Sequence, residues 1–162
     1  MFGLTYLGIG HTLISLIALV SGLILLIRDG AISWKSMTGK IYVITTIIVC
    51  ITGFGIFQHG GFGKAHALGI ITLIVLAVAL IAGGKNQPFG KASKYIETVC
   101  FSATFFFHLI PTIAETTTRL PLGAPIAASP DDPRIQLASG ICFLLFIVGA
   151  IAQVLRLRNK SH

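Results

Sequence analysis

Charged side chains are scarce in this chain: Asp, Glu, Lys and Arg together make up 10% of its 162 residues. A soluble globular protein carries about 25%, so there are too few charges to cover a water-facing surface. Disorder is excluded as well, because 54% of the residues are hydrophobic. Cysteines are few and none has CxxC spacing, so we expect them to be packing residues and not a disulfide framework. The three are Cys50, Cys100 and Cys142.

Long apolar runs are what the chain has in place of charge. Backbone polar groups in lipid must be satisfied within their own segment, so such runs are predicted to be helices. Each run is close to the roughly 20 residues that cross the hydrocarbon core. We therefore expect an all-α integral membrane protein, a single transmembrane domain over residues 1–162 with a bundle of five transmembrane helices. The predicted spans cover residues 4–27, 41–57, 65–82, 95–114 and 135–155, and the second is the shortest.

Lysine and arginine are divided unevenly between the two sides of these spans. Nine of the twelve lie on one side, and the other three are Lys64, Arg119 and Arg134. Basic residues favour the cytoplasm, which predicts an outside N-terminus and a cytoplasmic C-terminus in the bacterial inner membrane. Their spread over three juxtamembrane segments indicates contact with the lipid bilayer and not with nucleic acid. The nine are Arg28, Lys35, Lys40, Lys85, Lys91, Lys94, Arg156, Arg158 and Lys160.

The longest predicted connection is an outer loop over residues 115–134, which holds four of the six prolines. Long loops in compact proteins are often functional, and otherwise they are linkers. We leave both interpretations of this loop open.

Histidine is concentrated in the outer half of the predicted bundle, at His11, His59, His66 and His108. With a rise of about 1.5 Å per residue, His11 and His108 lie about 7 and about 5 Å outward of the midplane, and His66 about 11 Å. Ionisable residues in a span usually face the bundle interior, a partner or a water-filled cavity. His11 and His108 are therefore site candidates, and the alternative is a neutral imidazole bonded to a neighbouring helix without a ligand.

A b-type haem is our leading interpretation of these histidines. It needs two axial imidazoles from different helices at matching depth, with small residues beside them. His11 with His108 is the depth-matched pair, and His11 with His66 is the next. Arg119 or Lys64 would meet the haem propionates. Such a haem would serve membrane electron transfer, with a quinone or another redox partner.

A divalent metal is the alternative, since three imidazoles and a carboxylate suit zinc or copper. Glu115 follows His108 by seven residues, so the two share a face if the helix continues past Pro111. The i,i+4 spacing of Glu115 and Arg119 equally predicts an ion pair. A small-solute membrane protein and a structural or assembly subunit without a cofactor stay open, and the sequence does not decide whether the protein is an enzyme. The candidate metal ligands are His11, His59, His66, His108 and Glu115.

Two stretches of the chain resemble a bacterial family of predicted membrane proteins, domain of unknown function 2306. They are GHTLISLIALVSGLILL, followed by a basic turn and GKIYV, and FHLIPTIAETTTRLPLGAPIAASPDDP. The chain departs from the family's HRxxG-like turn, which ends here at Gly39, because Lys35 and Ser36 stand in place of His-Arg. The resemblance implies a membrane protein but no activity. Similarity to two-haem cytochrome b561 bundles is looser, since those need histidine pairs on both sides, and at most one haem fits here.

Overall fold

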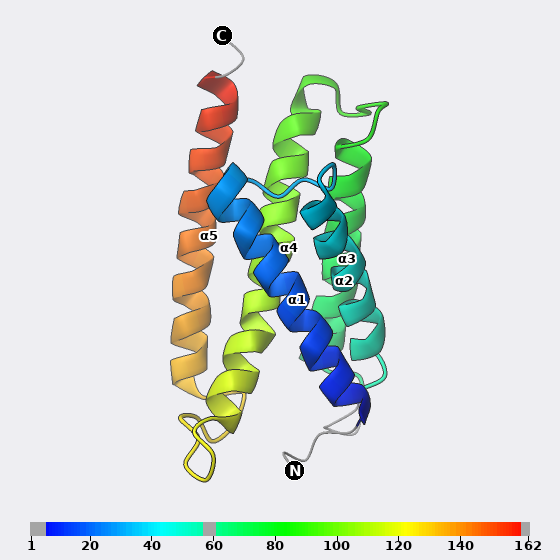
Figure 1. The fold of residues 1–162 in the computed structure, drawn as a ribbon. Coiled ribbons are helices and arrows are strands. Elements are labelled where there is room, and N and C mark those ends of the chain that lie inside the picture. The colour runs from blue at the N-terminus through cyan, green and yellow to red at the C-terminus, as the bar shows by residue number, and fades with distance from the viewer. Residues whose placement is uncertain (1–5, 57–60, 160–162) are drawn as a thin grey trace.

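The computed structural model describes residues 6–56 and 61–159, and within them it is helical with no strand. Four helices are long and apolar enough to cross a membrane, and a fifth is apolar but shorter. The predicted multi-pass helical bundle is confirmed at this level. The helices are α1 (Tyr6–Asp29), α2 (Met37–Gly53), α3 (Lys64–Ala82), α4 (Ser93–Arg119) and α5 (Pro133–Asn159), with a 3-10 turn at Gly90–Ala92 before α4 (Figure 1).

The second helix, α2, is the shortest of the five α-helices, as predicted. It begins at Met37 and not at residue 41. The side chain of Ser36 accepts a hydrogen bond from the backbone N–H of Gly39 at 3.0 Å, which caps the first turn. With 17 residues, α2 is about 25 Å long and covers most of the hydrocarbon core. The helix also ends earlier than predicted, at Gly53 and not at residue 57, which lies outside the described residues.

The fourth helix is longer than predicted, because it continues through Pro111 to Arg119. Past the proline, the hydroxyl of Thr117 donates to the carbonyl of Ile113 in its own helix at 2.7 Å. Hydroxyls that bond back to the helix in this way satisfy themselves without a partner from outside. The predicted outer loop of residues 115–134 was therefore too long, and the connection between α4 and α5 covers residues 120–132.

Helices α1 and α2 pack along each other, as do α3 and α4, while α2 also meets α3 and α5 packs along α4. Within α5 the one buried residue is Ile135, so α5 flanks the bundle at one side (Figure 1). The buried apolar cluster joins α1 to α4 and consists of Leu25, Ile32, Tyr42, Val43, Leu76, Ala79 and Phe101.

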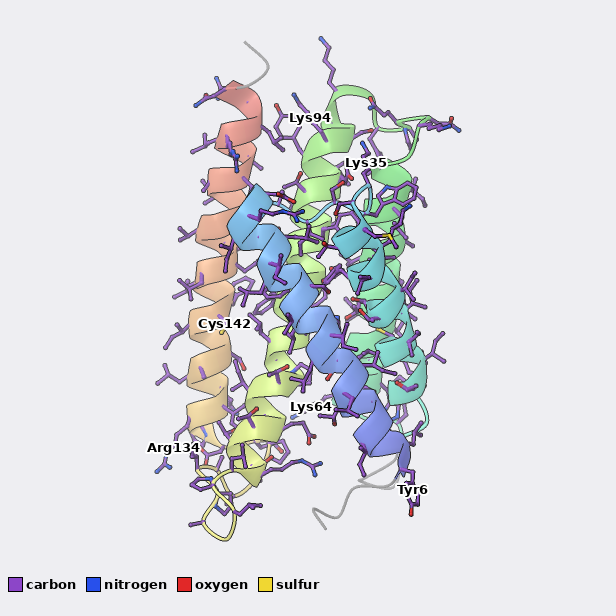
Figure 2. The ribbon with its side chains drawn as sticks, viewed as in Figure 1. Tyr6, Lys35, Lys64, Lys94, Arg134 and Cys142 are labelled. Carbon is purple, nitrogen blue, oxygen red and sulfur yellow. The ribbon has the colours of Figure 1, made fainter. Side chains whose placement is uncertain are left out.

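The two ends of the bundle carry different basic residues (Figure 2). Lys35 and Lys94 lie at the end where α5 finishes, which we name the C-terminal end. Lys64 and Arg134 lie at the opposite end, where α1 begins, which we name the N-terminal end. This arrangement is the one that the positive-inside argument requires, and the outward orientation of the N-terminal end stays a prediction.

Replacing Gly39 by Ala is expected to destabilise the bundle. A Cβ at Gly39 would overlap the backbone carbonyl of Ser33, which cannot move aside as a flexible side chain could. Overpacking of this kind lowers the free energy of unfolding by about 1–3 kcal/mol. Thermal unfolding of the protein in detergent, followed by circular dichroism, measures the loss.

The matched control is Gly140→Ala, because a Cβ at that helical glycine meets nothing within 4 Å. It should be neutral or slightly stabilising. Equal unfolding midpoints for the two variants would contradict the close contact at Gly39.

Candidate functional site

The imidazole of His11 lies against the end of α2. Its Nδ1 is hydrogen-bonded to the hydroxyl of Thr52 at 2.9 Å, and that hydroxyl also donates to the carbonyl of Ile48 at 2.8 Å. A threonine hydroxyl has one proton, so we infer that Nδ1 of His11 donates to Thr52. The Nε2 atom of the half-buried ring then keeps its lone pair.

The His11 ring lies beside Gly53 of α2. A Cβ built at Gly53 would lie 3.4 Å from Cε1 of His11, an ordinary van der Waals distance. The ring therefore packs on the backbone of α2 and has its hydrogen bond one residue earlier, at Thr52.

The imidazole of His108 lies deeper between α4 and α2. Its Nε2 is hydrogen-bonded to the hydroxyl of Thr46 at 3.0 Å. The ring of Tyr42 meets it edge-on, with ring centroids 6.2 Å apart. His108 is 6% exposed and both partners are fully buried, so this imidazole is held among polar groups away from lipid and water.

The polar contacts of His108 continue toward the middle of the bundle. Tyr42, whose ring meets His108 edge-on, lies one turn before Thr46 on α2. The hydroxyl of Tyr42 is 2.8 Å from that of Thr104, which in turn donates to the carbonyl of Phe101 at 2.8 Å. Because the hydroxyl proton of Thr104 is used in that bond, Tyr42 donates to Thr104, and the chain of hydroxyls ends on a backbone carbonyl.

His11 and His108 bond to the same helix, at threonines six residues apart, which is about 9 Å along α2. A shared site for the two imidazoles stays a prediction. Glu115 and Arg119 form an i,i+4 ion pair at the surface. The α4 positions 104, 108 and 115 are spaced so that Thr104, His108 and Glu115 share one helix face.

The other predicted site residues are placed elsewhere. His66 accepts a hydrogen bond at Nδ1 from the backbone N–H of Gly63 at 3.2 Å, and its ring stacks on Phe62. It thus caps the start of its own helix. Lys64 pairs with Asp131 at 2.8 Å. His59 lies outside the described residues.

A metal centre finds no support in the described part of the chain. Over residues 6–56 and 61–159, no three His, Cys, Asp or Glu side chains gather in a way that could hold an ion. The zinc or copper site with His11, His66, His108 and Glu115 therefore stays a prediction without a structural basis.

The imidazoles of His11 and His108 are not equally suited to bind a haem iron. His11 has the arrangement of an axial ligand, since its Nδ1 is held by a second group while Nε2 carries the lone pair. His108 differs, because Nε2, its atom nearest Thr46, already has a hydrogen bond in a densely packed surrounding. His108 can ligate iron only if it gives up that bond.

No family model, no curated protein and no solved structure matches this chain. The resemblance to domain of unknown function 2306 therefore stays a prediction, and the function has to be argued from the site.

The bond between His108 and Thr46 is expected to couple the two residues energetically. Intramembrane side-chain hydrogen bonds average about 0.6 kcal/mol and reach about 1.7 kcal/mol. We expect a coupling of about 0.5–1.5 kcal/mol in a double-mutant cycle of Thr46→Val and His108→Phe. Unfolding in mixed detergent micelles measures each corner of the cycle.

A second cycle of Thr45→Val with His108→Phe provides the control. Thr45 is the neighbouring threonine of α2, and its hydroxyl donates to the carbonyl of Ile41 in its own helix. Its coupling to His108 should be close to zero. Equal coupling in both cycles would mean that the bond between His108 and Thr46 is absent.

Proposed function

We propose that the protein is a haem b protein of membrane electron transfer, with His11 as the first axial ligand. The observation that carries the proposal is the hydrogen bond from Nδ1 of His11 to Thr52. That bond fixes the ring orientation and the tautomer, and it leaves Nε2 available. Metal-ligating histidines are oriented in this way by a partner on their other nitrogen.

His108 is the second imidazole of the proposed pair. It comes from a different helix than His11, and the two imidazoles bond to threonines six residues apart on α2. The hydroxyl of Thr46 orients His108 in the absence of iron. His66 is left out of the pair, because its Nδ1 accepts from the backbone N–H of Gly63, which places the proton of the neutral ring on Nε2.

The remaining residues of the site would bind the haem and exclude water from it. The His11 ring lies beside Gly53 of α2. The ion pair of Glu115 and Arg119 lies toward the surface, where Arg119 could exchange its partner for a propionate. A bound haem supplies reversible one-electron chemistry. The buried Tyr42 and Thr104 on the other side of His108 would close the site against the rest of the bundle.

Removing His11 is expected to remove the haem. After haem-supplemented expression, the purified protein should show the reduced-minus-oxidised absorption bands of a b-type haem, and His11→Phe should show none. Thr52→Val should lower haem affinity about 10–100-fold, as loss of a group that orients a ligand does elsewhere. Visible spectra and haem titration measure both effects.

Two control variants keep the spectrum of the wild-type protein under this proposal. Thr45→Val removes a hydroxyl from α2 that has no contact with His11, and His66→Phe removes an imidazole from α3. A wild-type protein without haem bands after supplementation would refute the proposal, as would a His11→Phe variant that keeps them.

A structural or assembly subunit without a cofactor is the second candidate. The observation that favours it is that both imidazoles already have hydrogen-bonded threonine partners on α2. In that case His11→Phe and His108→Phe would lower stability while the wild-type spectrum stays flat. The spectra above thus distinguish the two candidates.

A further inference from the structure

A groove lined by α4, α5 and Leu26 of α1 opens on the flank of the bundle. Its volume is about 180 Å³, and its walls are almost entirely apolar. Phe106 of α4 lies at its side, with its ring stacked on Phe146 of α5 at a centroid distance of 5.5 Å. The groove extends along α5 from Gln153 to Cys142.

The length of the groove corresponds to one leaflet of a bilayer. Eleven residues of helix separate Gln153 from Cys142, which is about 16 Å. Half of the hydrocarbon core is about 15 Å. Cys142 lies in the middle third of α5 (Figure 2), while Gln153 lies six residues before the last residue of that helix, Asn159. The groove therefore runs from one membrane surface to the midplane, as a single acyl chain does.

A second, more polar hollow of about 70 Å³ adjoins the groove at Gln153. Its lining includes Thr98, Gly30 and the guanidinium-bearing Arg156. Gly30 has a φ of +74°, and a Cβ there would overlap Arg156, so a glycine is needed for Arg156 to lie across the end of α1. One N–H group of Arg156 donates to the carbonyl of Asp29 at 3.1 Å.

The charge of this hollow suits an anion. The carboxylate of Asp29 also lines it, but both of its oxygens accept hydrogen bonds from Arg28, at 2.8 Å each. That pairing offsets the negative charge of Asp29 and leaves Arg156 as the unbalanced charge. Arginine has five N–H donors in a fork that matches phosphate, and basic pockets between helices at the cytoplasmic surface bind anionic headgroups.

We propose that these two hollows form one binding site for an anionic phospholipid. The phosphate lies beside Arg156 at the C-terminal end, and one acyl chain fills the groove along α5 as far as Cys142. Gln153 stands where headgroup and chain meet. Its Oε1 accepts from Ser102 of α4 at 2.8 Å and its Nε2 donates to the carbonyl of Gly30 at 2.9 Å, so its polar atoms are satisfied and the groove beyond it stays apolar.

Retention of phosphatidylglycerol against phosphatidylcholine tests the site. The protein is purified in detergent, exchanged into mixed micelles that contain both lipids in equal amounts, and analysed by native mass spectrometry. We expect selective retention of one phosphatidylglycerol. Arg156→Ala should lower it about five-fold, the effect of one basic residue near an anionic surface. Arg158→Ala should leave it unchanged, because Arg158 does not line the hollow.

Filling the groove provides a test that does not depend on charge. Gly149 lines the groove, and a Cβ built there would meet nothing within 4 Å. The variant Gly149→Leu should therefore fill the groove and lower retention of both lipids. Gly140→Leu, at the other open glycine of α5, should not. Equal retention of the two lipids by the wild-type protein, equal losses for Arg156→Ala and Arg158→Ala, or a co-purified quinone in place of the phospholipid would each overturn the proposal.

Discussion

A polar group in hydrocarbon needs a partner inside the protein, and for the imidazoles of His11 and His108 the partners come from α2. Thr52 and Thr46 of this helix bond to His11 and His108. These are contacts between elements distant in sequence, so they fix α1 and α4 to opposite parts of α2 as well as orienting the imidazoles. Because packing in lipid has no hydrophobic driving force between helices, such directional bonds determine which faces meet. The site and the arrangement of α1, α2 and α4 thus depend on the same few hydroxyls.

The sequence was sufficient for features that follow from position along a span. Hydropathy located five helices. Residue count placed His11 and His108 at similar depth, which stays a prediction, and in the structure their threonine partners lie six residues apart on α2. Depth says nothing of direction around the helix, so it could not separate His66 from the pair. A local signal could have done so, since a histidine at the third helical position can accept from the N-cap backbone, and His66 does this with Gly63.

Other features could not be predicted, because they arise from contacts between helices. The partners Thr46 and Thr52 are threonines like Thr45, whose hydroxyl bonds to its own helix, and composition does not tell these apart. The end of α4 was predicted too early, at residue 114, since the polar residues from Glu115 onward resemble a loop. In the structure the threonines near the end of that helix satisfy themselves on its carbonyls, so polarity there does not mean that the helix has ended.

The contacts that hold α5 in place differ from those of the other helices. It buries one residue, Ile135, and meets the rest of the bundle through aromatic contacts with Phe106 and through the polar bonds of Gln153 and Arg156 to the end of α1. A groove beside those contacts leaves atoms without neighbours, which loses dispersion energy unless something fills it. An acyl chain in that groove would restore these contacts, and its headgroup would engage the arginine that already holds α5 to α1. The lipid would then contribute to the packing of α5, while the imidazoles of α1 and α4, bonded to α2, would be unaffected by its loss.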